Sequence, residues 1–256
     1  MEKHILVTND DGVTAPGLMS LAAALRPLGK VTVLAPDKNW SASGHVKTLE
    51  RPLRVRQTIL ADGSPAWCSD GAPSDCVALA LLGFIREKID VVVSGINPNA
   101  NIGHDVTYSG TVTAALEAAI AGVNGVAVSL DRPEDLQGAV EYGPAARVAA
   151  GVVAQLFQRG LPTDIVLNVN VPYGDDGEIR GTHITRQGLR IYRDELLRRE
   201  DPRGRPYYWI GGETPTGVVE DGTDYGAIKE GYVSITPLQL DLTAHSRIEE
   251  LNNWGL

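Results

Sequence analysis

The sequence predicts an α/β fold built on a doubly wound, mostly parallel β-sheet. Short apolar runs with high β propensity occur at residues 5–8, 30–35, 89–94 and 164–171, and segments with helical spacing of apolar residues separate them. Polar, glycine-containing segments follow the first three of these runs, as is typical of loops at the carboxyl edge of such a sheet. We therefore expect a ligand site at that edge.

The first βαβ unit begins with residues 5–8 (ILVT), which form the first predicted strand. Gly17 opens a helix with apolar residues at helical spacing, and Pro27 and Gly29 end it. Residues 30–35 (KVTVLA) form the second strand. A strand, a helix and a strand in close succession predict a parallel pair with a right-handed connection.

The middle of the chain continues this alternation of strands and helices. Residues 46–68 predict short antiparallel strands, and Pro73 opens a helix. The apolar face of that helix is expected to comprise Val77, Ala80, Leu81 and Phe84. The strand at 89–94 is followed by a long Asn- and Gly-rich loop (97–109), a helix (110–122), a strand (125–129), a helix (136–159) and the last strand of the parallel core (164–171).

The alternation ends after Pro172, which divides the chain into a predicted core, residues 1–175, and a C-terminal part, residues 176–256. A strand at 232–236 and a short helix from Thr243 are expected to close the chain.

The C-terminal part contains an unusual basic and aromatic segment. Seven arginines lie between Arg186 and Arg205, and the sequence YYWI follows at 207–210. We expect residues 182–212 to form an extended β-hairpin arm that is solvated or contacts another subunit. A nucleic-acid surface is the alternative interpretation of the arginines.

Composition limits the classes of function. The 256 residues carry a formal net charge of −9, which argues against a protein that binds a nucleic acid polymer. No apolar run approaches the roughly 18 residues that span a bilayer, and no signal-peptide pattern is present, so we expect a soluble, cytoplasmic protein without membrane partners. Cys68 and Cys76 have neither the number nor the spacing of a zinc site or a disulfide framework, which favours buried free thiols.

Asp10 and Asp11 follow the first strand directly. Two adjacent carboxylates at the end of an apolar strand repel each other unless a cation lies near them. A divalent metal such as Mg²⁺, Mn²⁺ or Ca²⁺ would meet this need, and a solvated Asp-Gly turn is the alternative.

Two further segments are expected at the same edge of the sheet. They supply Ser41 and Ser43 after the second strand, and Asn97 and Asn101 after the third. All are oxygen donors, as Mg²⁺, Mn²⁺ or Ca²⁺ would require, and they do not match structural zinc.

Residues 108–111 (YSGT) lie at the start of the 110–122 helix. Free backbone N–H groups and the helix dipole make such a start an anion site, and Gly110 would let an anion approach the backbone. An ordinary N-cap by Ser109 or Thr111 is the alternative. A metal and an anion site in one crevice would together suggest phosphate chemistry.

Six segments carry a resemblance to a known family: TNDDG at 8–12, APDKNWS at 35–41, SGIN at 94–97, YSGT at 108–111, DPRGRPYYWIGG at 201–212 and GYVSITPLQLDLTAH at 231–245. In this order along the chain they resemble the SurE family. Members of this family are metal-dependent 5′/3′-nucleotidases, that is, nucleoside monophosphate phosphatases. The resemblance implies a Rossmann-like core with a protruding C-terminal hairpin that is exchanged in a homodimer or homotetramer.

The resemblance also implies roles for particular residues. Asp10, Asp11, Ser41 and Asn97 would bind one divalent cation per subunit, and Asn101, Ser109, Gly110 and Thr111 would bind phosphate. Asp10, Asp11 and Asn97 would be catalytic. We expect metal-activated water to attack the phosphoryl group, with Asp11 as the carboxylate that orients or deprotonates it. Two departures from the family pattern are Asn99, where glycine is usual, and His104-Asp105, where consecutive acids are common.

Two other classes of function remain open. Nucleoside hydrolases also place aspartates on a calcium after their first strand, but they have no use for an anion site at YSGT. A non-catalytic nucleotide-binding module of the Rossmann type would need GxGxxG after the first strand, where this chain has NDDGVTAPG.

Four aromatic or histidine side chains have less certain roles. His45 would assist the metal loop or be structural, and Trp40 would stack on a base or pack in a core or interface. His183 and His245 carry no spacing argument.

Overall fold

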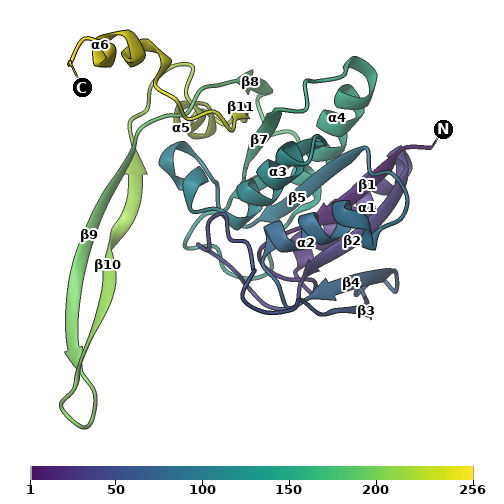
Figure 1. Cartoon of the computed structure of the whole chain (residues 1–256), viewed down its shortest axis with the longest axis horizontal. Coiled ribbons are helices and arrows are strands. Elements are labelled where there is room, and N and C mark those ends of the chain that lie inside the picture. The colour runs from purple at the N-terminus through teal and green to yellow at the C-terminus, as the bar shows by residue number, and fades with distance from the viewer. Residues whose placement is uncertain (1, 256) are drawn as a thin grey trace.

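The computed structural model of this chain describes residues 2–255. Nine strands form one mixed sheet in the order β3-β4-β2-β1-β5-β6-β7-β11-β8, and two further strands form a separate hairpin (Figure 1). The five central strands β2, β1, β5, β6 and β7 are parallel, which confirms the predicted fold class.

The sheet is organised around β1 (His4–Thr8), which pairs in parallel with β2 (Lys30–Pro36) on one side and β5 (Val91–Asn97) on the other. Helix α1 (Pro16–Leu25) connects β1 to β2 and continues as a 3₁₀ turn. β1 and β2 match the predicted runs within one residue, whereas β5 begins at Val91 instead of Ile89 and extends to Asn97. This extension places Asn97 itself at the carboxyl end of the strand.

Two short strands, β3 (Val55–Ile59) and β4 (Pro65–Ser69), form an antiparallel hairpin at one edge of the sheet, and β4 pairs with β2. Helix α2 (Pro73–Leu79) follows and continues as a wide turn through Phe84. The predicted apolar face is correct for Val77 and Ala80, which are buried, but wrong for Phe84, which is 39% exposed. Phe84 packs edge-on against Trp67 instead, with ring centroids 5.0 Å apart.

The second half of the parallel core contains α3 (Gly110–Ile120), β6 (Asn124–Asp131), α4 (Gly143–Arg159) and β7 (Ile165–Pro172). The prediction that α4 begins near residue 136 was wrong. Gly138 has a φ of +97°, and Pro144 occupies the first turn of the helix that begins at Gly143. A glycine in the left-handed region interrupts a helix, whereas proline is well placed in the first turn.

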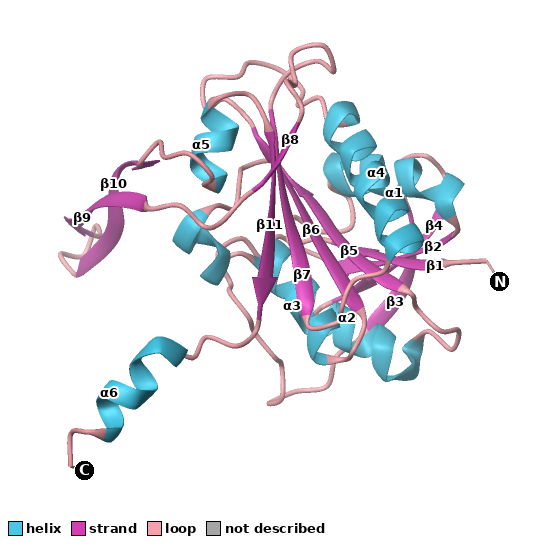
Figure 2. Ribbon diagram, turned by 90° about the horizontal axis from the view of Figure 1, so that it is seen from above, coloured by secondary structure: helices cyan, strands magenta, loops and turns pink. Residues whose placement is uncertain are grey.

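Helices cover both faces of the sheet, with α1 and α4 on one and α2 and α3 on the other (Figure 2). Successive residues of β1 alternate between the two layers because side chains of a strand point to opposite faces. Ile5 and Val7 pack with α1 and α4, whereas Leu6 packs with α2 and α3, and all three are fully buried. Cys68 and Cys76 are buried free thiols, as predicted.

The C-terminal part returns to the sheet. Strand β11 (Val233–Gln239) pairs antiparallel with β7, and β8 (Thr182–Ile184) pairs with β11. Helix α5 (Asp224–Lys229) precedes β11. The prediction that the arm begins at residue 182 was therefore wrong, because residues 182–184 belong to the main sheet.

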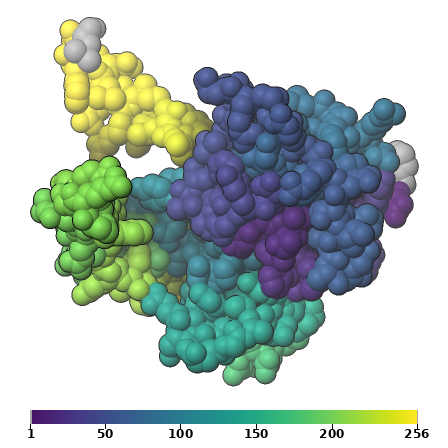
Figure 3. Space-filling view, turned by 90° about the horizontal axis from the view of Figure 1, so that it is seen from below, coloured from purple at the N-terminus to yellow at the C-terminus, as the bar shows by residue number. Residues whose placement is uncertain are grey.

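The arm consists of β9 (Arg190–Glu200) and β10 (Pro206–Gly217). The arm projects from the body beside α5 (Figure 1). Helix α6 (Ile248–Asn252) lies close to the C-terminus. Figure 3 shows the green arm and the yellow C-terminal segment at the same side of the molecule. The arm exposes large apolar side chains: Leu196 is 69% exposed, Trp209 63% and Ile210 83%. Within residues 2–255, no helix combines the length and the apolar character needed to cross a bilayer.

Candidate active site

The predicted site residues come from loops at the carboxyl ends of β1, β2 and β5. Five of them line one cavity of about 270 Å³: Asp10, Ser41, Asn97, Asn101 and Ser109. The structure thus brings together residues that lie up to about 100 positions apart. Parallel strands with adjacent carboxyl ends explain this convergence.

Backbone hydrogen bonds fix the loops around the cavity. The Trp40 N–H donates to the Asp10 carbonyl at 2.7 Å, and the Gly44 N–H donates to the Tyr108 carbonyl at 2.9 Å. Asn9 closes the first loop, because its Nδ2 donates to the Gly12 carbonyl at 3.0 Å and its Oδ1 accepts from the Gly12 N–H at 3.2 Å. The φ of Gly12 is +103°, a value that favours glycine.

Asp10 is held at the start of helix α3. The Thr111 hydroxyl donates to Asp10 Oδ1 at 2.6 Å, and the backbone N–H groups of Gly110 and Thr111 also favour the charged carboxylate. Burial has the larger effect and raises the pKa of Asp10, which is only 3% exposed. A Cβ on Gly110 would lie 2.7 Å from the Asp10 Cβ, so this close approach requires glycine.

Asp11 is partly buried beside Asp10. Burial, and secondarily the charge of Asp10, raise its pKa to about 6. Its one side-chain hydrogen bond within residues 2–255 is a long one, 3.4 Å from Asn39 Nδ2. Neither carboxylate forms an ion pair with a Lys, Arg or His side chain of the described chain, as the ion pairs present all involve other acids.

This pair of acids fits a divalent metal. Two close carboxylates without a cationic partner create a local demand for positive charge, and hydroxyl and amide oxygens complete a donor set suited to hard cations. Asn97 Nδ2 donates to the Asn99 carbonyl at 2.5 Å, which leaves Asn97 Oδ1 as the free acceptor. The φ of Asn99 is not positive, so asparagine at this position needs no left-handed backbone.

The predicted phosphate-binding residues divide into two groups. Ser109 lines the cavity and also caps α3, since its Oγ accepts from the Val112 N–H at 3.1 Å. Gly110 and Thr111 contact Asp10 instead, so the anion at the helix start in this structure is the Asp10 carboxylate. A role of Gly110 and Thr111 in binding phosphate stays a prediction.

Asn101 is fixed by side chains of β6 and β7. Its N–H donates to Asn170 Oδ1 at 2.8 Å, its Nδ2 donates to Ser129 Oγ at 2.8 Å, and its carbonyl accepts from Asn168 Nδ2 at 2.8 Å. These supporting residues were not singled out from the sequence, because isolated Asn and Ser residues in strands carry no motif.

Six further residues line the cavity: Ala42, Asn99, Ala100, Asp105, Tyr108 and Arg190. Arg190 Nε lies 2.9 Å from Asp105 Oδ2, although Arg190 is the first residue of the arm. The sequence marked Asp105 only as a departure from the family pattern, and Arg190 only as one of seven arginines.

His45 has a structural partner. Its Nε2 lies 2.9 Å from Glu117 Oε2, and Lys47 Nζ lies 3.0 Å from Glu117 Oε1. Glu117 is buried on α3, so this cluster anchors the loop that carries Ser41. Ser43 does not line the cavity, and its hydroxyl is buried with no hydrogen-bond partner among residues 2–255.

Trp40, His183 and His245 lie outside the cavity. The amine of Lys38 lies 5.0 Å from the ring centroid of Trp40. His183 stacks on Tyr232, with ring centroids 4.0 Å apart, and His245 pairs with Asp241 near the C-terminus.

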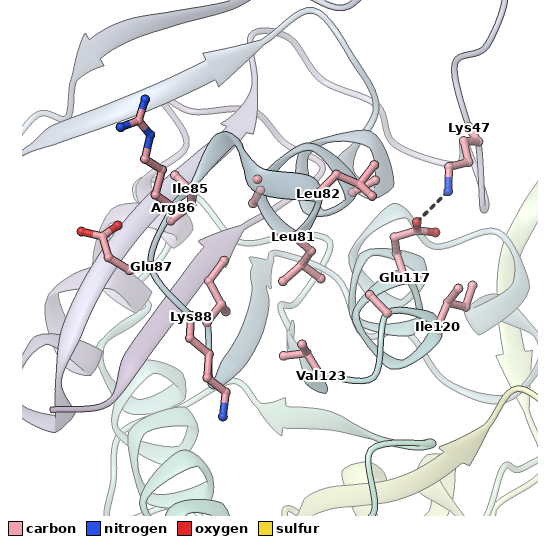
Figure 4. A pocket seen from close by; sticks show the side chains of 15 residues that line it. Lys47, Leu81, Leu82, Ile85, Arg86, Glu87, Lys88, Glu117, Ile120 and Val123 are labelled. Atoms are coloured by element: carbon pink, nitrogen blue, oxygen red, sulfur yellow. Dashed lines mark hydrogen bonds and ion pairs between the residues drawn. The ribbon is translucent and has the colours of Figure 1, made fainter. Parts of the chain in front are cut away.

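A larger cavity of about 740 Å³ lies away from these residues, between the end of α2 and α3 (Figure 4). Leu81, Leu82, Ile120 and Val123 form much of its wall, with the Lys47–Glu117 ion pair at one side. Arg86, Glu87 and Lys88 also line it, but Figure 4 shows their side chains pointing in different directions, so its size alone does not make it the candidate active site.

Comparisons with known proteins agree on one family. A family model described as "Survival protein SurE" matches residues 5–194. A "5'-nucleotidase SurE" of Chloroflexus aggregans is 52% identical over 251 residues, covering 98% of each chain, and one of Herpetosiphon aurantiacus is 51% identical over 97% of each chain.

A solved structure agrees with these relatives. The crystal structure of SurE protein from Aquifex aeolicus matches with a TM-score of 0.82 at 38% identity, covering 97% of this chain and 98% of that one. On the family model, the full-length relatives and the shared fold, this chain belongs to the SurE family.

Proposed function

We propose that this chain is a divalent-metal-dependent nucleotidase that hydrolyses nucleoside 5′- and 3′-monophosphates to nucleoside and phosphate. The observation that carries the proposal is the adjacent pair Asp10 and Asp11, neither of which forms an ion pair with a Lys, Arg or His side chain within residues 2–255. Asp10 is buried and lines the cavity with Ser41, Asn97 and Ser109, and Asp11 lies beside it, partly buried and outside the cavity lining. The relatives named 5′-nucleotidase support a phosphoric monoester hydrolase, and the 3′ activity rests on the family resemblance alone.

Asp10, Asp11, Ser41 and Asn97 would hold one Mg²⁺, Mn²⁺ or Ca²⁺ ion. When bound, such an ion neutralises charge on the phosphoryl group and lowers the pKa of a water molecule. Thr111 holds the Asp10 carboxylate through its hydroxyl, and the Asn99 carbonyl holds the Asn97 amide. These contacts preorganise the donors for the ion.

The remaining residues act on substrate and water. Asp11, the less buried of the two acids, would orient or deprotonate the attacking water. Asn101 and Ser109 line the cavity and would position the phosphoryl oxygens, with Gly110 and Thr111 at the helix start behind them. No covalent intermediate is required.

We also propose that the arm joins copies of this chain into a homodimer or homotetramer. Its exposed Trp209 and Ile210 support this role, because apolar side chains on a projecting hairpin gain stability when another chain covers them. The net charge of −9 disfavours a nucleic acid polymer as its partner.

Phosphate release from AMP tests the proposed activity. Purified, chelator-stripped protein is assayed with and without Mn²⁺ or Mg²⁺, beside the Asp10→Asn variant. Release that needs both the metal and Asp10 supports the proposal. Release of free base would indicate a nucleoside hydrolase, and AMP binding without turnover at any metal concentration would indicate a binding module.

A further inference from the structure

Arg190 brings a positive charge to the candidate active site. Of the described residues that line the 270 Å³ cavity, it is the one with a cationic side chain, and it shares that cavity with Asp10 and Asn97. Its side chain is only 14% exposed, although it belongs to the otherwise exposed arm. Asp105, which lines the same cavity, pairs with Arg190 through Nε only, so the terminal nitrogens of the guanidinium stay available to an anionic substrate.

The position of Arg190 is set by several contacts. Its Nε lies 2.9 Å from Asp105 Oδ2, and the Tyr192 hydroxyl donates to the other oxygen of Asp105. Its guanidinium lies 5.7 Å from the ring centroid of Tyr225. A Cβ on Gly103 would lie 2.8 Å from Arg190 Cγ, so glycine at 103 makes room for the stem.

A second set of contacts joins the residues just before the arm to the loop that follows β5. The buried carboxylate of Asp224 accepts from the Gly103 N–H and from the Gly188 N–H, both at 2.7 Å. Gln187 Nε2 donates to the Gly103 carbonyl at 2.8 Å. Contacts between the loop after β5 and the residues just before the arm therefore hold Arg190 in place before any ligand binds.

The guanidinium retains hydrogen-bonding capacity. Its Nε faces Asp105 Oδ2 at 2.9 Å, and its two terminal nitrogens form no hydrogen bond within residues 2–255. An arginine has five N–H donors in a planar fork that matches two oxygens of a phosphate group. A preorganised guanidinium with free donors beside a cavity is suited to an oxyanion.

We propose that Arg190, supplied by the base of the arm, binds the phosphoryl oxygens of the substrate. The identity of that substrate as a phosphate monoester rests on the proposed function. Asp105 and Asp224 act as positioning residues, because Asp105 pairs with the guanidinium and Asp224 holds the backbone at Gly188, two residues before Arg190. The arm then contributes a residue to the active site, in addition to its proposed role in joining copies of this chain.

Three variants test this role. Arg190→Gln removes the charge, Arg190→Lys keeps the charge without the fork, and Arg198→Gln is the matched control. Arg198 lies farther along the same strand, is 57% exposed and pairs with Glu200. We measure kcat and KM for AMP and for p-nitrophenyl phosphate, and the Kd of inorganic phosphate by calorimetry, with circular dichroism to verify folding.

For Arg190→Gln we expect kcat/KM to fall about 10- to 100-fold on both substrates, and phosphate to bind about 10- to 100-fold more weakly, as for loss of a charge-assisted hydrogen bond. Arg190→Lys should lose less, and Arg198→Gln should match the parent protein. Equal losses on both substrates are expected because the contact is with the phosphoryl group they share.

Unchanged phosphate binding and kcat/KM in Arg190→Gln would overturn the inference, and so would a loss confined to AMP, which would place Arg190 on the nucleoside. If Arg190→Gln does not fold, unchanged phosphate binding in Arg190→Lys overturns it and weakened binding supports it. If the parent protein releases no phosphate from any ester, the proposed function fails, while the phosphate titration still decides the role of Arg190.

Discussion

We predict that the affinity of the site for a divalent metal depends on Thr111, although Thr111 does not line the cavity, because its hydroxyl donates a hydrogen bond to Asp10. Thr111 is fully buried, and its hydroxyl donates to Asp10 Oδ1 at 2.6 Å. Thr111→Val replaces the hydroxyl with a methyl group of similar size and removes this donor. A hydrogen bond to a charged group contributes about 1.5 to 3 kcal/mol. Without this hydrogen bond the charged form of the Asp10 carboxylate, which would bind the metal, is less stable.

We therefore expect Thr111→Val to weaken Mn²⁺ binding about 10- to 100-fold, the range typical of residues that support a metal ligand. Calorimetric titration of chelator-stripped protein with Mn²⁺ measures this directly. Thr113→Val is the matched control, because Thr113 is buried two residues later on the same helix and donates to the Ser109 carbonyl at 2.8 Å. Metal affinity equal to that of the parent protein, with a raised KM for AMP, would refute this reasoning and assign Thr111 to phosphate.

Three further predictions concern stability and assembly. Adding Mn²⁺ at 100 times its Kd to chelator-stripped protein should raise the free energy of unfolding by about 2.7 kcal/mol, because the ion binds only the folded site. Urea titration measures this gain. The same gain in the Asp10→Asn variant would contradict the assignment of Asp10 as a metal ligand. Glu117→Gln should lower the free energy of unfolding by about 1 to 3 kcal/mol, since His45 and Lys47 both lose a buried charged partner; an unchanged urea midpoint would argue against this anchor. Ile210→Glu should shift the protein to a smaller species in light scattering, because it places a charge on the apolar part of the arm; an unchanged mass would exclude that part of the arm from the interface.

Much of the fold could be predicted because it depends on local patterns. The apolar run before Asp10 specifies a buried strand, and the polar residues that follow it specify a loop at the sheet edge. Repetition of this pattern at Ser41 and Asn97 was enough to predict one site from three segments. The errors fell where a pattern was ambiguous, as at residues 136–142, where apolar spacing resembles a helix but Gly138 interrupts it.

The sequence by itself determined the parallel core, the two carboxylates at its edge and the existence of a projecting arm, since each follows from residue types within a short window. Only the tertiary structure decided that Thr111 faces Asp10, that residues 182–184 join the main sheet and that Arg190 reaches the cavity. These outcomes depend on contacts between segments far apart in the chain, such as Asp105 with Arg190 and Gly103 with Asp224. Such pairings are selected by packing and by the burial of charged groups, and no local pattern of residues encodes them.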